Sequence, residues 1–338
     1  MERSISWTSF NRYHMAGALI ALALMLMWAS RQELKEGFLG AVWLRKTHRR
    51  EDELISPAAA ARGFIIGTVV LIVWGIAAGG QLFAVVSLLF LLLCMMVVFS
   101  RLVAAAGVLW VTARWDPIHI ITKVFGTTSL SPASYTMMNW WTMGFTWHGS
   151  QFLMPYVMDG LAITHRGRLA PRWILWGMIG AIALSAITAT VFSLSFIYSH
   201  GASYLSEYQT QHLPGWALRL FSSYLRQPEP TDPYAVAFLV SGAVAMWLLV
   251  QAHLAFVWWP LYPLPYVIGG TKLIMTLWFP AFAGWLAKAL ILRAGGGAAY
   301  RAARPLFLGM ILGEFFLVGL WVIVDAVTGT TGHVIISG

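Results

Sequence analysis

Long runs of apolar residues recur along the chain and are separated by short polar or charged stretches. A membrane-spanning helix needs about 20 mainly apolar residues, and several of these runs are that long. The pattern predicts an all-α, polytopic integral membrane helix bundle with seven to eight spanning segments, one or two of them broken or re-entrant. The candidate segments are residues 14–30, 63–80, 82–100, 134–160, 172–198, 234–259, 265–292 and 305–327.

Local signals mark several helix ends. Ser56-Pro57, Ser131-Pro132 and Asp232-Pro233 each place a capping oxygen directly before a proline. A capping side chain accepts a hydrogen bond from the first helical turn, and proline is favoured at the first helical position. These pairs therefore predict three helix starts, and Gly79-Gly80-Gln81 predicts a tight hairpin between the second and third spans.

Two stretches between the spans are polar. Residues 31–62 carry many charges, and their apolar side chains fall near one helical face, which predicts a cytoplasmic, amphipathic surface helix; a charged loop is the alternative. Residues 199–233 predict an extramembrane loop with a short surface helix around Trp216–Tyr224. Because no soluble domain is visible, residues 1–338 are predicted to form a single transmembrane domain. The apolar side chains of the amphipathic stretch are Leu34, Phe38, Leu39, Val42 and Trp43.

Basic residues predict the orientation of the spans. Their number in residues 31–62 places that loop in the cytoplasm, and the first span is then an uncleaved anchor with its N-terminus outside. The later loops conflict with this rule whether residues 134–160 cross the membrane fully or dip in and return. Seven and eight crossings therefore both remain open. We expect a multi-pass protein of the cell membrane, most simply a bacterial inner membrane.

The composition supports a membrane protein and excludes several other classes. Hydrophobic residues make up 59% of the 338 residues and charged residues only 10%, against about 25% charged in soluble domains. The net charge is +9, and the basic residues lie between apolar segments. This pattern predicts contact with the lipid bilayer and not with nucleic acid. Cys94 is the only cysteine, so one chain holds no disulfide or cysteine metal site. Because soluble-enzyme motifs are absent, we expect neither an enzyme nor a metal site.

Glu314 is the most conspicuous charge inside an apolar segment. An ionisable group at the bilayer centre costs about 2.5–3.5 kcal/mol on insertion scales. Glu314 follows Gly309 and Gly313, a small-residue face on which another helix can approach. We interpret Glu314 as a carboxylate that couples to protons or substrate. The alternative is a structural carboxylate paired with Lys288 or Lys272.

Arg101 and Asp159 are further candidates for substrate or proton coupling, together with Lys288. Arg101 ends the third span, where it either contacts substrate or a buried acid, or extends to the surface. Asp159 follows Pro155. A proline inside an apolar segment frees backbone carbonyls, and transporters build sites from interrupted helices; the alternative is an ordinary helix end.

His148 and His253 lie in strongly apolar segments. Two facing histidines could bind haem or chlorophyll, whereas the alternative is hydrogen bonding within the bundle and no cofactor. The stiff turn Trp258–Tyr266, rich in aromatic residues and proline, either forms an interfacial belt or lines the mouth of a cavity.

Several motifs resemble one family in order and spacing. They are Arg101-Leu-Val-Ala-Ala-Ala-Gly107, Leu153-Met154-Pro155 and the run from Trp258-Trp259-Pro260 through Gly284-Trp285 and Arg304-Pro305 to Gly313-Glu314-Phe315. From about residue 31 to 333 the chain resembles an uncharacterised bacterial branch of the oligopeptide transporter superfamily, most densely after residue 255. The resemblance implies transport of peptide-like or metal-chelate solutes.

The chain departs from that family in two ways. It corresponds only to the C-terminal half of the family's members, and Ala105 stands where the resemblance implies an acidic residue. The shorter length predicts a second membrane polypeptide or a homo-oligomer as partner. Both departures support an alternative function, a non-transporting structural subunit of a larger membrane complex associated with pigment or haem.

Overall fold

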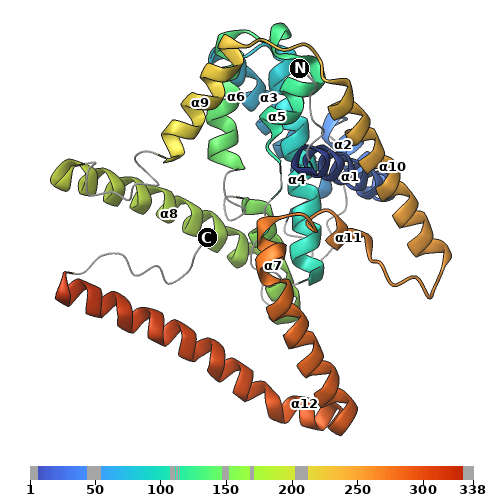
Figure 1. Cartoon of the computed structure of the whole chain (residues 1–338), viewed down its shortest axis with the longest axis vertical. Coiled ribbons are helices and arrows are strands. Elements are labelled where there is room, and N and C mark those ends of the chain that lie inside the picture. Colours follow the sequence, from blue (N-terminus) through green and yellow to red (C-terminus); the bar gives the residue numbers. More distant parts are fainter. Residues whose placement is uncertain are drawn as a thin grey trace. The chain divides into compact units, whose positions relative to one another are not determined.

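A computed structural model describes residues 7–43, 55–106, 111, 113, 115–146, 152–167, 171–201 and 212–329. Within these ranges the chain forms twelve α-helices and one short 3-10 helix, and no strand occurs in them. The predicted all-α architecture is therefore confirmed (Figure 1). The chain forms two compact units, Met1–Ile274 and Met275–Gly338, and each is described by itself.

The first unit contains all helices except the greater part of the last. They are α1 (Trp7–Ala29), α2 (Arg31–Val42), α3 (Pro57–Ala77), α4 (Leu82–Ala106), α5 (Pro117–Phe125), η1 (Thr127–Ser129), α6 (Pro132–Phe145), α7 (Leu153–Gly167), α8 (Pro171–His200), α9 (Leu213–Arg226), α10 (Pro233–Ala255) and α11 (Pro263–Tyr266). The last helix, α12 (Lys272–Thr328), begins in the first unit and makes up most of the second.

Six of the described helices are long and apolar enough to cross a membrane, so the protein is a membrane protein. The spans are Ser9–Ala29, Pro57–Ala77, Leu82–Ala105, Trp173–His200, Pro233–Ala255 and Ile274–Asp325. The last of these, Ile274–Asp325, is 52 residues long, more than twice the length of one crossing. It is interrupted by a bend at Gly296, and its two parts correspond to the segments predicted at 265–292 and 305–327.

The predicted segment 134–160 is divided into two helices. α6 ends at Phe145 and α7 begins at Leu153, and neither is among the six spans. The prediction of a broken segment is confirmed here, but the predicted position of the break, at Pro155, is wrong. Pro155 lies in the first turn of α7, where backbone N–H groups have no partner within the helix and a proline removes no hydrogen bond.

The predicted capping residues begin α3, α6 and α10. Ser56 Oγ accepts a hydrogen bond from Ala59 N at 3.4 Å, and Ser131 Oγ accepts one from Ser134 N at 3.2 Å. Asp232 Oδ1 accepts one from Tyr234 N at 3.1 Å. Each cap is followed by a proline at the start of its helix, so these three predictions are confirmed.

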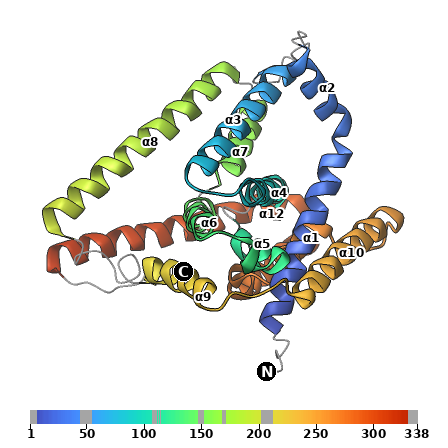
Figure 2. The same cartoon turned by 90° about the horizontal axis from the view of Figure 1, so that it is seen from above.

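α1 and α10 pack against each other (Figure 2). Two glycines allow this close contact. A Cβ added at Gly17 would lie 1.8 Å from the carbonyl oxygen of Leu239, and one added at Gly242 would lie 1.8 Å from that of His14. Each helix thus places a glycine against the backbone of the other, a small-residue contact typical of membrane helices.

α2 is the helix predicted in the amphipathic stretch 31–62. It packs on α3 through its small residues Gly37, Gly40 and Ala41, which are buried. Its large apolar side chains, including Val42 and Trp43, remain exposed. Of these large side chains, Phe38 also contacts α3, where its ring lies 6.1 Å from that of Phe64.

The segment before α10 is fixed to α5 and η1. Thr127 N donates to the carbonyl oxygen of Glu229 at 2.8 Å, and Glu229 N donates to Thr127 Oγ1 at 2.6 Å. Lys123 and Glu229 form an ion pair. α9 supplies the short helix predicted within 199–233. These contacts fix the position at which α10 begins.

The described part of the second unit is formed by α12 after Ile274, which bends at Gly296. This glycine has φ 60° and ψ −155°, a conformation that is essentially restricted to glycine. Two straight arms meet at the bend (Figure 1). Lys288 on the first arm places its Nζ 5.6 Å from the ring centroid of Tyr300 on the second, which is a cation–π distance.

Candidate functional site

The chain is not a single helix between α10 and the start of α12. α10 ends at Ala255, α11 has only four residues, and turns lead to Lys272. Thr271 is buried; its hydroxyl donates to the carbonyl oxygen of Ile268 at 2.8 Å and accepts from Ile274 N at 3.4 Å. Residues 256–271 are therefore a broken helical connection in the first unit.

Tyr266 of this connection contacts His14 of α1. Its Oη lies 2.6 Å from His14 Nε2, and His14 Nδ1 lies 3.0 Å from Ser241 Oγ on α10. Only 8% of His14 is exposed. One buried imidazole thus joins three elements that are distant in sequence.

The hydrogen bonds define the neutral tautomer of His14. Ser241 Oγ donates its proton to the carbonyl oxygen of Phe238 at 2.7 Å, so it must accept from His14. A neutral imidazole has one donor and one acceptor nitrogen. Nδ1–H therefore donates to Ser241, and Nε2 accepts from the hydroxyl of Tyr266. The chain of donors runs from Tyr266 through His14 and Ser241 to the backbone of α10.

Asn11 and Phe10 extend this cluster. Asn11 lies one turn before His14, and a Cβ added at Gly270 would lie 2.4 Å from Asn11 Nδ2. The glycine therefore allows the Asn11 amide to approach the broken connection. The ring of Phe10 packs 4.9 Å from that of His14. We call Asn11, His14, Ser241 and Tyr266 the His14 cluster.

The His14 cluster can change its protonation pattern. If His14 takes up a proton, both ring nitrogens become donors, and Tyr266 has to turn its hydroxyl so that it accepts. Ser241, at the other end, lies on the exposed side of α10. The arrangement can therefore link a proton at His14 to the position of the broken connection.

The comparison with protein families gives one match over nearly the whole chain. The model of a family described as "Family of unknown function (DUF6785)" matches residues 2–337. The chain belongs to this family. No curated protein and no solved structure gave a match.

In this DUF6785 member, the four predicted coupling residues lie outside the His14 cluster. Arg101 is exposed near the end of α4, and Asp159 is exposed in α7. Glu314 is exposed on the second arm of α12. Lys288 contacts Tyr300 across the bend, and within residues 275–329 no ion pair joins it to Glu314.

The two histidines proposed as haem or chlorophyll ligands are described unequally. His148 lies outside the described residues. His253 is half-buried in α10, and its ring packs edge-on against that of Tyr262 at 5.0 Å. Among the described residues, no group of three or more His, Cys, Asp or Glu side chains is suited to a metal ion.

Sequence analysis missed Asn11, His14 and Ser241. A usable signal was present, because Asn11 and His14 are spaced i, i+3 at the start of an otherwise apolar span and share a helix face. The partner of His14 had no such signal, since the contact joins residues 252 positions apart. Tyr266, however, belongs to the turn that was considered as a cavity mouth.

Proposed function

We propose that this chain is part of a membrane transporter, and that the His14 cluster couples a proton to movement of the broken connection between α10 and α12. The observation that carries the proposal is the 2.6 Å contact between His14 and Tyr266, which joins a spanning helix to the short helix α11 within the broken connection. Transporters commonly form their sites from discontinuous helices at membrane depth. Buried ionisable groups in such helices serve as proton relays.

The resemblance to the oligopeptide transporter superfamily supports peptide-like or metal-chelate solutes as substrates, and it supports the bacterial cell membrane as the location. In this proposal, any coupling by the four charged candidate residues takes place outside the His14 cluster. These residues are Glu314, Arg101, Asp159 and Lys288. A partner chain or second copy supplies the half that the resemblance implies.

Uptake by reconstituted vesicles tests the proposal. The full chain, together with membrane proteins encoded beside it, is reconstituted and given a labelled peptide under an inward proton gradient. Loss of one hydrogen bond of about 1 kcal/mol corresponds to roughly a fivefold effect. Tyr266→Phe should therefore reduce proton-driven uptake at least about fivefold, whereas Tyr198→Phe on the exposed surface of α8 should leave it unchanged.

Two results would count against the proposal. Wild-type vesicles that accumulate neither peptides nor metal chelates with every partner present would contradict transport. Uptake that is identical in the wild type and Tyr266→Phe would remove the role of the His14 cluster.

A second candidate function is a non-transporting subunit of a larger assembly. The observation that favours it is α8, because within its span no residue is buried by the rest of the described chain. A partner helix or lipid must then cover a length of 28 residues. Mass spectrometry of gently solubilised protein, with an absorption spectrum, tests this: co-purified subunits with visible pigment bands would support it, and a bare chain with a featureless spectrum would contradict it.

A further inference from the structure

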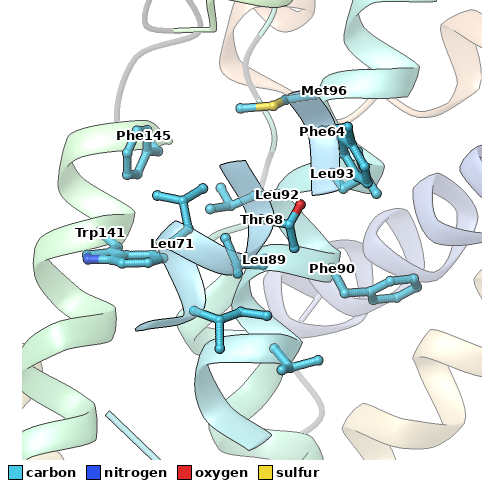
Figure 3. A pocket seen from close by; sticks show the side chains of 12 residues that line it. Phe64, Thr68, Leu71, Leu89, Phe90, Leu92, Leu93, Met96, Trp141 and Phe145 are labelled. Carbon is cyan, nitrogen blue, oxygen red and sulfur yellow. The ribbon is translucent and has the colours of Figure 1, made fainter. Parts of the chain in front are cut away.

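A hollow of about 310 Å³ lies between α3, α4 and α6. Figure 3 shows Phe64 and Leu93 together at one end, and Trp141 and Phe145 of α6 on the other side. We call it the α3–α4 groove. Its volume is at the lower limit of small-molecule sites, which run from about 300 to 1,000 Å³.

The lining of the α3–α4 groove suits a hydrocarbon chain. Of its twelve lining residues only Thr68 and the indole of Trp141 carry a polar side-chain group. Both α3 and α4 are long and apolar enough to span a membrane, so the groove opens toward the acyl-chain region. The almost wholly apolar lining therefore matches a single hydrocarbon chain.

One end of the groove carries positive charge supplied by α2. The ring of Phe38 lies 6.1 Å from that of Phe64, at 82°. Lys35 and Arg31 precede Phe38 by three and seven residues, spacings that share one helix face. Glu33 and Glu36 fall on other faces. The side of α2 that reaches the groove is therefore cationic, although α2 as a whole contains both signs of charge.

α4 adds a further cation beyond the same end. Leu93 lines the groove, and Arg101 follows it by eight residues, about 80° further round the helix. At 1.5 Å per residue, Arg101 lies about 12 Å further along the axis. Its side chain is exposed. Cations thus lie beyond the end of the groove that begins at Phe64 and Leu93.

We propose that the α3–α4 groove binds one acyl chain of an anionic glycerophospholipid, whose headgroup lies at the cationic end of the groove, where α2 carries Lys35 and α4 carries Arg101. A phospholipid has the required order of groups, a charged head followed by an apolar chain. Basic residues at the membrane surface each contribute about 1 kcal/mol to binding anionic lipid. Trp141 and Phe145 contact the chain at the side of α6. This site does not depend on the function proposed for the His14 cluster.

Photolabelling in vesicles tests this site with the full chain. The probe is phosphatidylglycerol with a diazirine in its acyl chain, compared with phosphatidylcholine that carries the same chain. Peptide mass spectrometry should locate the phosphatidylglycerol label in residues 64–72 and 89–96. Lys35→Gln combined with Arg101→Gln should reduce this labelling about fivefold for each cation removed, equivalent to ~1 kcal/mol each. The matched control pair, Arg226→Gln with Arg301→Gln, should leave it unchanged.

A second variant tests the groove itself. Leu89→Trp fills it and should abolish the label from both lipids; Thr68→Phe serves the same purpose if Leu89→Trp does not fold. Equal labelling by the two lipids in the wild type, or labelling of α8 as strong as that of the groove, would overturn the proposal. So would a cross-link that showed a second polypeptide seated in the groove.

Discussion

His14 Nε2 lies 2.6 Å from Tyr266 Oη, although 252 residues separate them in the sequence. The contact joins the first span to the connection between α10 and α12. Since His14 also contacts Ser241 at 3.0 Å, a single side chain fixes the arrangement of α1, α10 and α11.

We expect the side chains of His14 and Tyr266 to be energetically coupled. Tyr266→Phe removes a buried hydrogen bond and should lower the free energy of unfolding by about 1 kcal/mol. His14→Phe removes the same bond together with that to Ser241 and should cost more. In the double variant the two losses should not add, because the shared bond can be lost only once. Thermal unfolding in mild detergent measures all three variants, and strictly additive losses would show that the contact contributes nothing.

The α1–α10 contact should tolerate no extra methyl group. A Cβ at Gly242 would lie 1.8 Å from the carbonyl oxygen of His14, so Gly242→Ala must separate the two helices or bend one of them. Overpacking of this kind costs typically 1–3 kcal/mol. Gly180→Ala on α8 is the matched control, because no atom lies within 4 Å of the added Cβ. Its stability should be equal or slightly higher, since alanine favours a helix over glycine by about 1 kcal/mol. Equal unfolding temperatures for the two variants would contradict the close contact.

Local signals in the sequence predicted much of the fold. The caps at Ser56, Ser131 and Asp232 act within three residues of themselves, and each begins a helix where it was expected. The apolar runs gave the spans for the same reason, because length and composition decide whether a segment can cross a membrane. The fold class could therefore be predicted without knowledge of any long-range contact.

The candidate site could not be predicted in the same way. Sequence reasoning favoured charged residues in apolar segments, such as Glu314, because placing a charge in the bilayer costs free energy and such residues are usually functional. His14 is neutral in the chain of hydrogen bonds derived above, and it lies near a helix start among other polar residues, so this criterion overlooked it. His14 is important because α10 and the broken connection lie close against α1. Gly17, Gly242 and Gly270 allow these close contacts. A glycine in an apolar run does not reveal its partner.

Tyr224 predicts how stability responds to alkaline pH. Its hydroxyl accepts a hydrogen bond from Thr122 Oγ1 at 3.3 Å, and its ring stacks on Tyr135 at 5.2 Å. Burial raises the pKa of Tyr224 from 10.0 to about 12. The folded state thus favours the protonated phenol, and this contribution is complete below pH 10 and is lost as the pH rises to about 12.

The expected result is an unfolding temperature that falls between pH 10 and 12 in the wild type. Tyr224→Phe cannot ionise, so it should show a weaker dependence over the same interval. Thermal unfolding in detergent, with tyrosinate absorbance as a second signal, measures both proteins. Parallel curves for the two would show that Tyr224 is not the group responsible.

The second arm of α12 predicts a partner helix. Within residues 275–329 no atom lies within 4 Å of a Cβ added at Gly309 or Gly313, and Glu314 beside them is exposed. Lipid offers a carboxylate no hydrogen-bond donor, whereas a second helix at a small-residue face can supply one. We therefore expect the full chain in mild detergent to form a homo-oligomer or to retain a second membrane polypeptide. Gly313→Leu should abolish this association, as measured by native mass spectrometry. Gly319→Leu, on another face of the same arm and equally free of neighbours within that unit, should preserve it. A stable, fully active monomer would contradict the prediction, and equal association in both variants would place the partner on another surface.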